Sequence, residues 1–170
     1  MQDRMVNMST PVIHTSSTLS TRVADLWQAE EAIGQRLDAW LLLHTRAVGE
    51  GKAQEASLVR RGYHRARREL RVHLRALGRQ VVRLPMVAPA DADAARPDSA
   101  ARGLQRLHRD LTRANDRLNR LSRMATLRRE HKTAAVLSDL HEAQLDALEL
   151  VRDLFQIGQR ASRAALQSAA

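Results

Sequence analysis

Apolar residues recur at alternating steps of three and four along most of the chain, which is the spacing of one face of an α-helix. The clearest example is residues 104–125, where arginines occupy most of the remaining helix surface. Its apolar face consists of Leu104, Leu107, Leu111, Ala114, Leu118, Leu121 and Ala125. A helix with one narrow apolar face has to pack against other helices, so the pattern predicts a helical bundle organised around this stretch.

The same spacing predicts four helices, at residues 19–48, 55–84, 101–129 and 133–162. Gly49 and Gly51 should end the first helix. Prolines at 85, 89 and 97 should keep the chain between the second and third helices from being helical, and such a long connection suits a crossover between two parallel helices. We therefore predict an all-α protein, a four-helix bundle over 19–165 with a long crossover between helices 2 and 3. A flexible tail at 1–18 and a short tail at 166–170 should flank it.

Composition supports helices and restricts the chemistry. Hydrophobic residues make up 44% of the chain but aromatic residues only 2%, so the core should consist of Leu, Ala and Val. The chain contains no cysteine, which rules out disulfides and thiolate metal sites and fits a reducing compartment. It shows no export signal and no apolar run long enough to span a membrane. We expect a soluble, cytoplasmic protein without a membrane partner.

The chain is strongly basic, with a formal net charge of +9, and all basic residues except Lys52 and Lys132 are arginines. They are concentrated on the second and third predicted helices. A solvated face rarely needs so many charges of one sign. These helices are therefore predicted to bind a polyanion, most plausibly DNA, through phosphate contacts that do not depend on base sequence. The candidate residues are Arg60, Arg61, Arg67, Arg68, Arg71, Arg75, Arg106, Arg109, Arg113 and Arg120.

The fourth predicted helix reverses the sign of the charge. One stripe along it consists of Asp139, Glu142, Asp146, Glu149 and Asp153. We expect this stripe to pair with arginines of the second or third helix and thereby to fix the order of packing. A carboxylate metal cluster is the alternative interpretation. The sequence leaves open which arginines the stripe neutralises and which face outward.

Glu30 and His44 interrupt the apolar face of the first helix and are the candidate metal ligands. They lie fourteen residues apart, about 21 Å along a helix, so they cannot share one ion without help from other helices. The simpler interpretation is that Glu30 pairs with a neighbouring arginine and that His44 meets water or a carbonyl. Glu69 and His73, four residues apart, could form only a weak two-ligand site. No phosphate-binding loop, nucleophile elbow or cysteine nucleophile is present, so we expect no catalysis.

The order of elements resembles that of the Dps family, the DNA-binding ferritin-like proteins of starved cells. The resemblance spans residues 19–157 and rests on three segments. Residues 42–49 resemble the end of that family's first helix, where a ligand histidine (here His44) stands five residues before a glycine. Leu77-Gly78 is similar to the Leu-Gly that closes its second helix, and residues 133–142 are similar to its last helix. The resemblance implies a ferritin-like bundle that binds DNA as a homo-oligomer, in which modest basic patches multiply by avidity.

This sequence lacks most of the residues that bind iron in that family. Its iron site lies between subunits and needs a second histidine after the glycine and two carboxylates on the second helix. Here residues 53–59 contain no histidine, and arginines follow at 67, 68, 71 and 75. Arginines around His44 would repel Fe²⁺, so we expect no iron cofactor there. An iron-oxidising or storage protein with a displaced site is a further alternative. Its candidate ligands are His44, Glu30, His73, His141 and Glu142.

Two other interpretations stay open. His64, Arg67, Arg68, Arg71 and Arg75 resemble the histidine-and-arginine helix of CHAD domains, and that resemblance implies polyphosphate as the polyanion. Alternatively, the protein is a structural or adaptor bundle whose charges only determine helix pairing and oligomer order.

Overall fold

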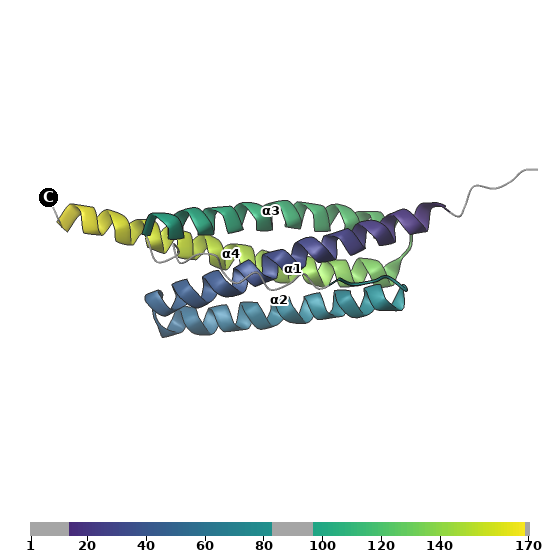
Figure 1. Cartoon of the computed structure of the whole chain (residues 1–170), viewed down its shortest axis with the longest axis horizontal. Helices are drawn as coiled ribbons and strands as arrows, with labels where there is room; N and C mark the ends of the chain where they lie inside the picture. The colour runs from purple at the N-terminus through teal and green to yellow at the C-terminus, as the bar shows by residue number, and fades with distance from the viewer. Residues whose placement is uncertain (1–13, 83–96, 169–170) are drawn as a thin grey trace, which may run out of the picture.

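A computed structural model describes residues 14–82 and 97–168, which form four helices (Figure 1). These are α1 (His14–Val48), α2 (Glu50–Ala76), α3 (Pro97–Leu127) and α4 (His131–Ser168). The described residues contain no strand, which confirms the predicted all-α four-helix bundle. The first helix begins at His14, five residues before the predicted start, and the last ends at Ser168. The remaining parts of the predicted tails and most of the predicted crossover lie outside the described residues.

The four helices form a square in cross-section. Each of α1 and α4 packs against both α2 and α3, α1 and α4 scarcely touch, and no contact joins α2 to α3 within the described ranges. Therefore α2 and α3 lie on opposite edges of the bundle. They run in the same direction, and α3 begins at the end of the bundle opposite to the end where α2 stops (Figure 1). This is the arrangement that the predicted crossover requires.

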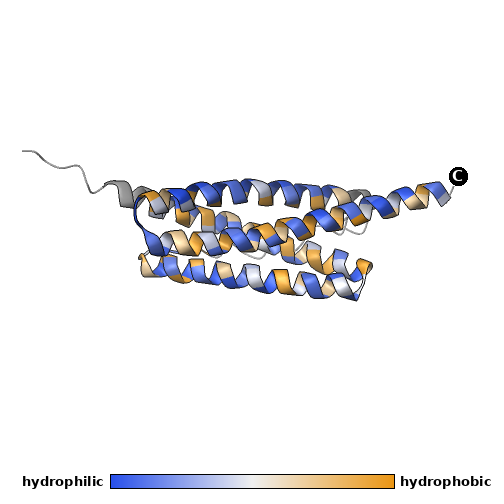
Figure 2. Ribbon diagram, turned by 180° about the vertical axis from the view of Figure 1, so that it is seen from behind, coloured by the Kyte–Doolittle hydropathy of each residue, from blue (hydrophilic) through white to orange (hydrophobic). Residues whose placement is uncertain are grey.

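Leucine fills most of the core, as the apolar spacing predicts. All seven predicted core residues of α3 are buried, with exposed fractions of 7% or less. Figure 2 shows hydrophilic residues along the outer side of this helix, while the hydrophobic residues face the bundle. Burying a leucine side chain contributes about 1.5–3 kcal/mol, so the seam formed by α3 is a major source of stability.

Glycine shapes both ends of α2. Gly49, with φ 111°, is the single residue between α1 and α2, and only glycine adopts such a φ without strain. Gly51 lies inside α2, so it does not help to end α1 as predicted. At the other end, Gly78 has φ 70° and its N–H donates to the carbonyl oxygen of Arg75 at 2.9 Å.

The end of α2 corrects the predicted boundary at residue 84. The N–H of Arg79 donates to the carbonyl oxygen of Leu74 at 2.9 Å. Together with the Gly78 bond, this forms a Schellman motif, which satisfies the last carbonyls and stops the helix. Leu77, which caps the end of the helix, is 44% exposed. The helix closes at the Leu77-Gly78 pair on which the resemblance partly rests.

The last helix is longer than its neighbours. Its final part projects beyond the other three helices (Figure 1), and residues 158–168 are all exposed. None of the described helices contains an apolar stretch long enough to cross a membrane.

Candidate polyanion-binding surface

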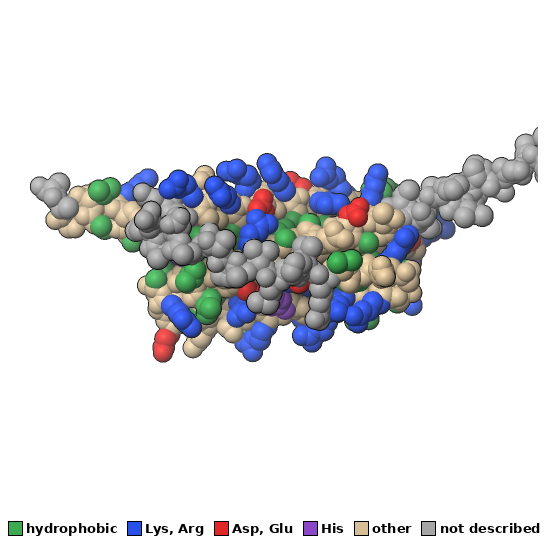
Figure 3. Space-filling model, viewed as in Figure 1, with side chains coloured by type: hydrophobic (Ala, Val, Ile, Leu, Met, Phe, Trp, Pro, Cys, Tyr) green, Lys and Arg blue, Asp and Glu red, His purple; other side chains and the backbone are tan. Residues whose placement is uncertain are grey.

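Arginines line the outer edge formed by α3. Figure 3 shows Lys and Arg side chains gathered along this edge and along the opposite edge, which is formed by α2. The exposed arginines of α3 without an acidic partner among the described residues are Arg106, Arg109, Arg113, Arg120 and Arg123. We call these five residues the α3 row. Four of them were predicted candidates; Arg123 belongs to the same row and was not among them.

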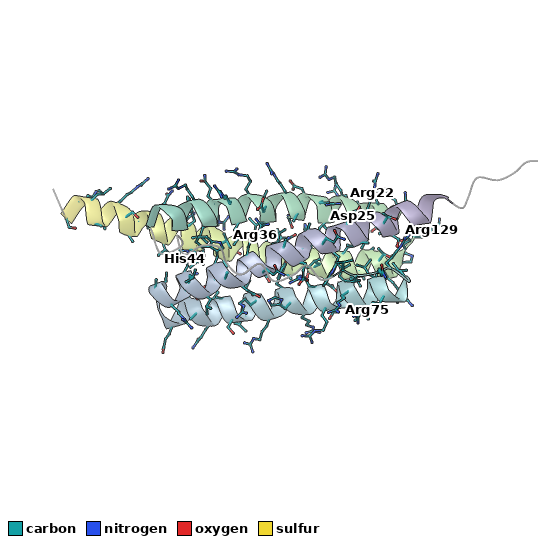
Figure 4. All side chains as sticks on the ribbon, viewed as in Figure 1. Arg22, Asp25, Arg36, His44, Arg75 and Arg129 are labelled. Atoms are coloured by element: carbon teal, nitrogen blue, oxygen red, sulfur yellow. The ribbon has the colours of Figure 1, made fainter. Side chains whose placement is uncertain are left out.

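Acidic residues neutralise little of the α3 row. Asp110, which lies between Arg109 and Arg113 in the sequence, is turned toward α1. It forms an ion pair there with Arg36, with Arg36 Nη1 and Asp110 Oδ2 2.5 Å apart. Figure 4 shows Arg36 at this junction of α1 and α3. Asp116 is the one exposed acidic residue of α3 among residues 101–127. The row therefore keeps a clear excess of positive charge over a length of about 26 Å.

The arginines of α2 divide into an inner and an outer set. Arg60 is half-buried against α1 and donates from Nε to Asp38 Oδ1 at 2.6 Å. Arg71 is partly buried as well. Arg61, Arg68 and Arg75 are exposed, and Arg75 projects away from the bundle (Figure 4). Of the predicted candidates on α2, only these three arginines are exposed.

Arg67 is not a surface residue, which corrects the prediction that it contacts a polyanion. It is 6% exposed and forms an ion pair with Glu31 of α1. Its guanidinium carbon also lies 5.2 Å from the ring centre of Trp27 and 5.6 Å from that of Tyr63. A Cβ atom on Gly34 would lie 2.2 Å from Arg67 Nη1, so the glycine makes room for the guanidinium.

His64 also belongs to the contact between α1 and α2. Its Nε2 lies 2.9 Å from both carboxylate oxygens of Asp38, and its Nδ1 lies 3.5 Å from Arg67 Nη1. Burial alone would raise the pKa of Asp38, but hydrogen bonds from His64 and Arg60 outweigh it and lower that pKa. The polyphosphate interpretation therefore loses two of its five residues, His64 and Arg67, to contacts within the bundle.

The helix positions separate the two basic edges. Because α2 and α3 lie on opposite edges of the bundle, their outer arginines face in different directions. The predicted candidates of helices 2 and 3 therefore form two surfaces. Of the two, the α3 row is the longer and is interrupted by fewer acidic or paired residues.

The acidic stripe of α4 neutralises few of these arginines, contrary to the prediction. Within the described residues no ion pair involves Asp139, Glu142 or Asp146. Asp153 pairs with Lys52 of α2 at 3.3 Å, and Glu149 contacts only Arg152 of its own helix, at 3.4 Å. Most of the acidic stripe is thus exposed negative charge rather than a fixed partner of the basic helices.

Glu30 is fully buried, but its partners differ from the predicted arginine. Its carboxylate accepts hydrogen bonds from Tyr63 Oη at 2.5 Å and from Gln144 Nε2 at 3.0 Å. Burial raises the pKa of Glu30, and these bonds, with Arg67 and Arg117 nearby, offset only part of that effect. Because these contacts come from α2 and α4, Glu30 joins three helices at the centre of the bundle.

His44 lies near the C-terminal end of α1 (Figure 4), far along that helix from Glu30. Its ring stacks on Trp40 with the ring centres 5.2 Å apart, and burial lowers the pKa of His44. Its buried Nε2 has no hydrogen-bond partner among the described residues. The described residues contain no group of three His, Asp or Glu side chains that could hold a metal ion.

The remaining candidate ligands of a displaced iron site are also dispersed. His73 contacts Thr133 Oγ1 at 3.0 Å. His141 and Glu142 lie in the first third of α4, and Glu142 is exposed on the acidic stripe. The structure therefore offers a charged surface rather than a metal centre as its candidate site.

No protein-family model matches this chain, and comparisons with curated proteins and with solved structures return no match either.

Proposed function

We propose that this protein is a non-catalytic, ferritin-like bundle of the Dps type that binds a polyanion, most favourably duplex DNA, through the α3 row. The observation that carries the proposal is the row itself. Five exposed arginines follow one helix edge, and no described acidic side chain pairs with any of them.

The dimensions of the α3 row suit a nucleic-acid backbone. It spans about 26 Å, which approaches one turn of duplex DNA, about 34 Å. Duplex DNA carries one negative charge per about 1.7 Å of its axis, so a row of this length lies opposite a high density of phosphate charge. Guanidinium groups bind phosphate oxygens in bidentate fashion, which favours arginine over lysine at such a surface.

The chemistry of the row favours binding without sequence readout. No Phe, Tyr or Trp occurs on α3, so the surface lacks the large aromatic side chains on which unpaired bases stack best. Phosphate contacts fix position and supply affinity but carry no base information. We therefore expect similar affinity for duplexes of different sequence and strong weakening by salt.

The connectivity supports the ferritin-like part of the proposal. Helices α2 and α3 are parallel to each other and diagonally opposed. Helices α1 and α4 lie between them, and both run in the opposite direction (Figure 1). A bundle with one long crossover is the ferritin-like topology.

A structural or adaptor role is the second candidate, favoured by three ion pairs that arginines form between helices. These are Arg36 with Asp110, Arg60 with Asp38 and Arg67 with Glu31. They show that some arginines of the chain serve helix pairing. None of them belongs to the α3 row, so this role does not account for the row.

The proposal is tested by comparing two variants that lose the same charge. R109Q/R113Q/R120Q neutralises the centre of the α3 row, whereas R152Q/R160Q/R163Q neutralises three exposed arginines of α4. Fluorescence anisotropy with a labelled duplex should show at least about a tenfold loss of affinity for the first variant and little loss for the second. Circular dichroism should show equal helix content in both variants. Equal losses in both would indicate a net-charge effect and contradict a site on α3.

A further inference from the structure

The outer side of α2 carries a second pattern that its own bundle does not use. Exposed residues recur there at alternating steps of three and four, which is the spacing of a helix-packing seam. The residues are Leu58, Arg61, Arg65, Arg68, Val72 and Arg75. The side chains of Leu58 and Val72 are 62% and 60% exposed. We call this set the α2 seam. The α2 seam combines four arginines with two exposed aliphatic side chains, so it offers both charge and apolar surface to a partner.

The acidic stripe of α4 faces α2 across a groove, and Arg65 is the member of the α2 seam that lines it. A groove of about 340 Å³ separates the two helices, and its lining includes Arg65 and Glu69 on one side and Asp139, Glu142 and Asp146 on the other. Arg65 contacts Glu69 of its own helix at 3.3 Å, and no described ion pair crosses the groove. One face of the molecule therefore carries a basic helix edge and an acidic helix edge side by side.

Two contacts between α2 and α4 fix their relative height along the bundle. Lys52 Nζ lies 3.3 Å from Asp153 Oδ2 near one end, and His73 Nε2 lies 3.0 Å from Thr133 Oγ1 near the other. Because the helices are antiparallel, these contacts place the stretch 61–68 of α2 level with the stretch 139–146 of α4. The three central arginines of the seam and the three unpaired carboxylates thus occupy the same section of the bundle.

From this juxtaposition we infer that a second copy of this chain packs on the face formed by α2 and α4. A two-fold axis parallel to the helices, placed between α2 and α4, lays α2 of one copy over α4 of the other. This operation leaves every residue at its original height, so Arg61, Arg65 and Arg68 of each copy meet the carboxylates at 139, 142 and 146 of its partner. The interface is isologous and forms the same contacts twice.

A second copy fits this face better than an unrelated partner does. The face carries the arginines of α2 and the carboxylates of α4 at the same position along the bundle. In a copy rotated about the two-fold axis, the carboxylates therefore lie opposite the arginines, and the arginines opposite the carboxylates. Leu58 and Val72, which are 62% and 60% exposed, supply apolar surface on the α2 side of the contact. Exposed ion pairs are individually weak and screened by salt, so the dimer should dissociate as ionic strength rises.

The test uses two charge-reversal variants, measured by light scattering after size exclusion in the absence of nucleic acid. R61E/R65E/R68E makes both edges acidic, and D139R/E142R/D146R makes both edges basic. The wild type should be dimeric at low salt, and each variant alone should be monomeric. An equimolar mixture of the two should form a heterodimer, because each edge again faces its opposite charge.

Controls distinguish this interface from misfolding and from other surfaces. R61Q/R65Q/R68Q keeps the seam neutral and should weaken the dimer without loss of helix content, even if a reversed variant folds poorly. R106E/R109E/R113E on α3 should leave the dimer intact; its dissociation would overturn the inference in favour of α3. A monomeric wild type, or a mixture that stays monomeric, would also overturn it. Because no polyanion is present, none of these outcomes depends on the DNA proposal.

Discussion

The hydroxyl group of Tyr63 donates a hydrogen bond of 2.5 Å to the carboxylate of Glu30, and both side chains are fully buried. The same hydroxyl lies 3.2 Å from the carbonyl oxygen of Glu30. Tyr63 therefore ties α2 to the side chain and the backbone of α1 at the centre of the bundle. Its loss would leave a buried carboxylate with Gln144 as its remaining side-chain donor.

Tyr63→Phe should destabilise the protein by about 1–3 kcal/mol, because it removes a donor from a buried acceptor while leaving the ring in place. Urea unfolding followed by circular dichroism at 222 nm measures the change. An unfolding free energy equal to that of the wild type would show that the bond contributes nothing.

Glu30→Gln should change how stability depends on pH. Burial raises the pKa of Glu30 above its ordinary value of 4.5. The folded state therefore holds a proton that the unfolded state releases, and stability falls as pH rises from 4.5 through the pKa of the folded state. The glutamine variant lacks this titration, so its stability relative to the wild type should increase over that window.

Urea midpoints of both proteins, taken at intervals from pH 4.5 to neutrality, measure this difference. All other groups titrate alike in the two proteins, so they cancel in the comparison. Parallel curves would contradict a raised pKa at Glu30.

Gly103→Ala should destabilise the bundle, because a Cβ atom there would lie 1.9 Å from Cζ2 of Trp40. Overpacking of this kind costs about 1–3 kcal/mol. Gly62→Ala is the matched control in an exposed part of α2, where a Cβ atom would meet nothing within 4 Å. It should stabilise the helix by about 0.5–1 kcal/mol. Thermal unfolding of the two variants should shift in opposite directions; shifts of the same sign would contradict the packing of Trp40 on α3.

The fold was predictable because its main signal is local. The spacing of three and four between Leu104 and Ala125 identified the buried face of α3 without knowledge of any partner helix. The end of α2 was missed for a physical reason. Val81 continues the apolar spacing beyond Gly78, and the spacing does not reveal that Gly78 adopts a positive φ that stops the helix.

The site was less predictable, because it depends on which residues face one another. Arginines occupy many positions of α2, and only the packing distinguishes Arg67, enclosed by Gly34 and Glu31, from exposed Arg68. In the same way, Asp139 follows the spacing of a pairing stripe, but its neighbours could not be inferred without the order of the helices. Gly34, level with Arg67, is the sequence signal that could have indicated a buried side chain there.

The central claim is that the α3 row binds phosphates, and the salt dependence of DNA binding tests it most directly. The measurement is the dissociation constant of a labelled duplex of about 30 base pairs, three helical turns, at several salt concentrations from about 50 to 200 mM. If each of the five arginines contacts one phosphate, a plot of the logarithm of affinity against the logarithm of salt concentration should have a slope of about −4.5. In R109Q/R113Q/R120Q the slope should become shallower by nearly three, since each lost contact removes about one. Binding that is absent at low salt, or a slope that the variant leaves unchanged, would contradict the claim.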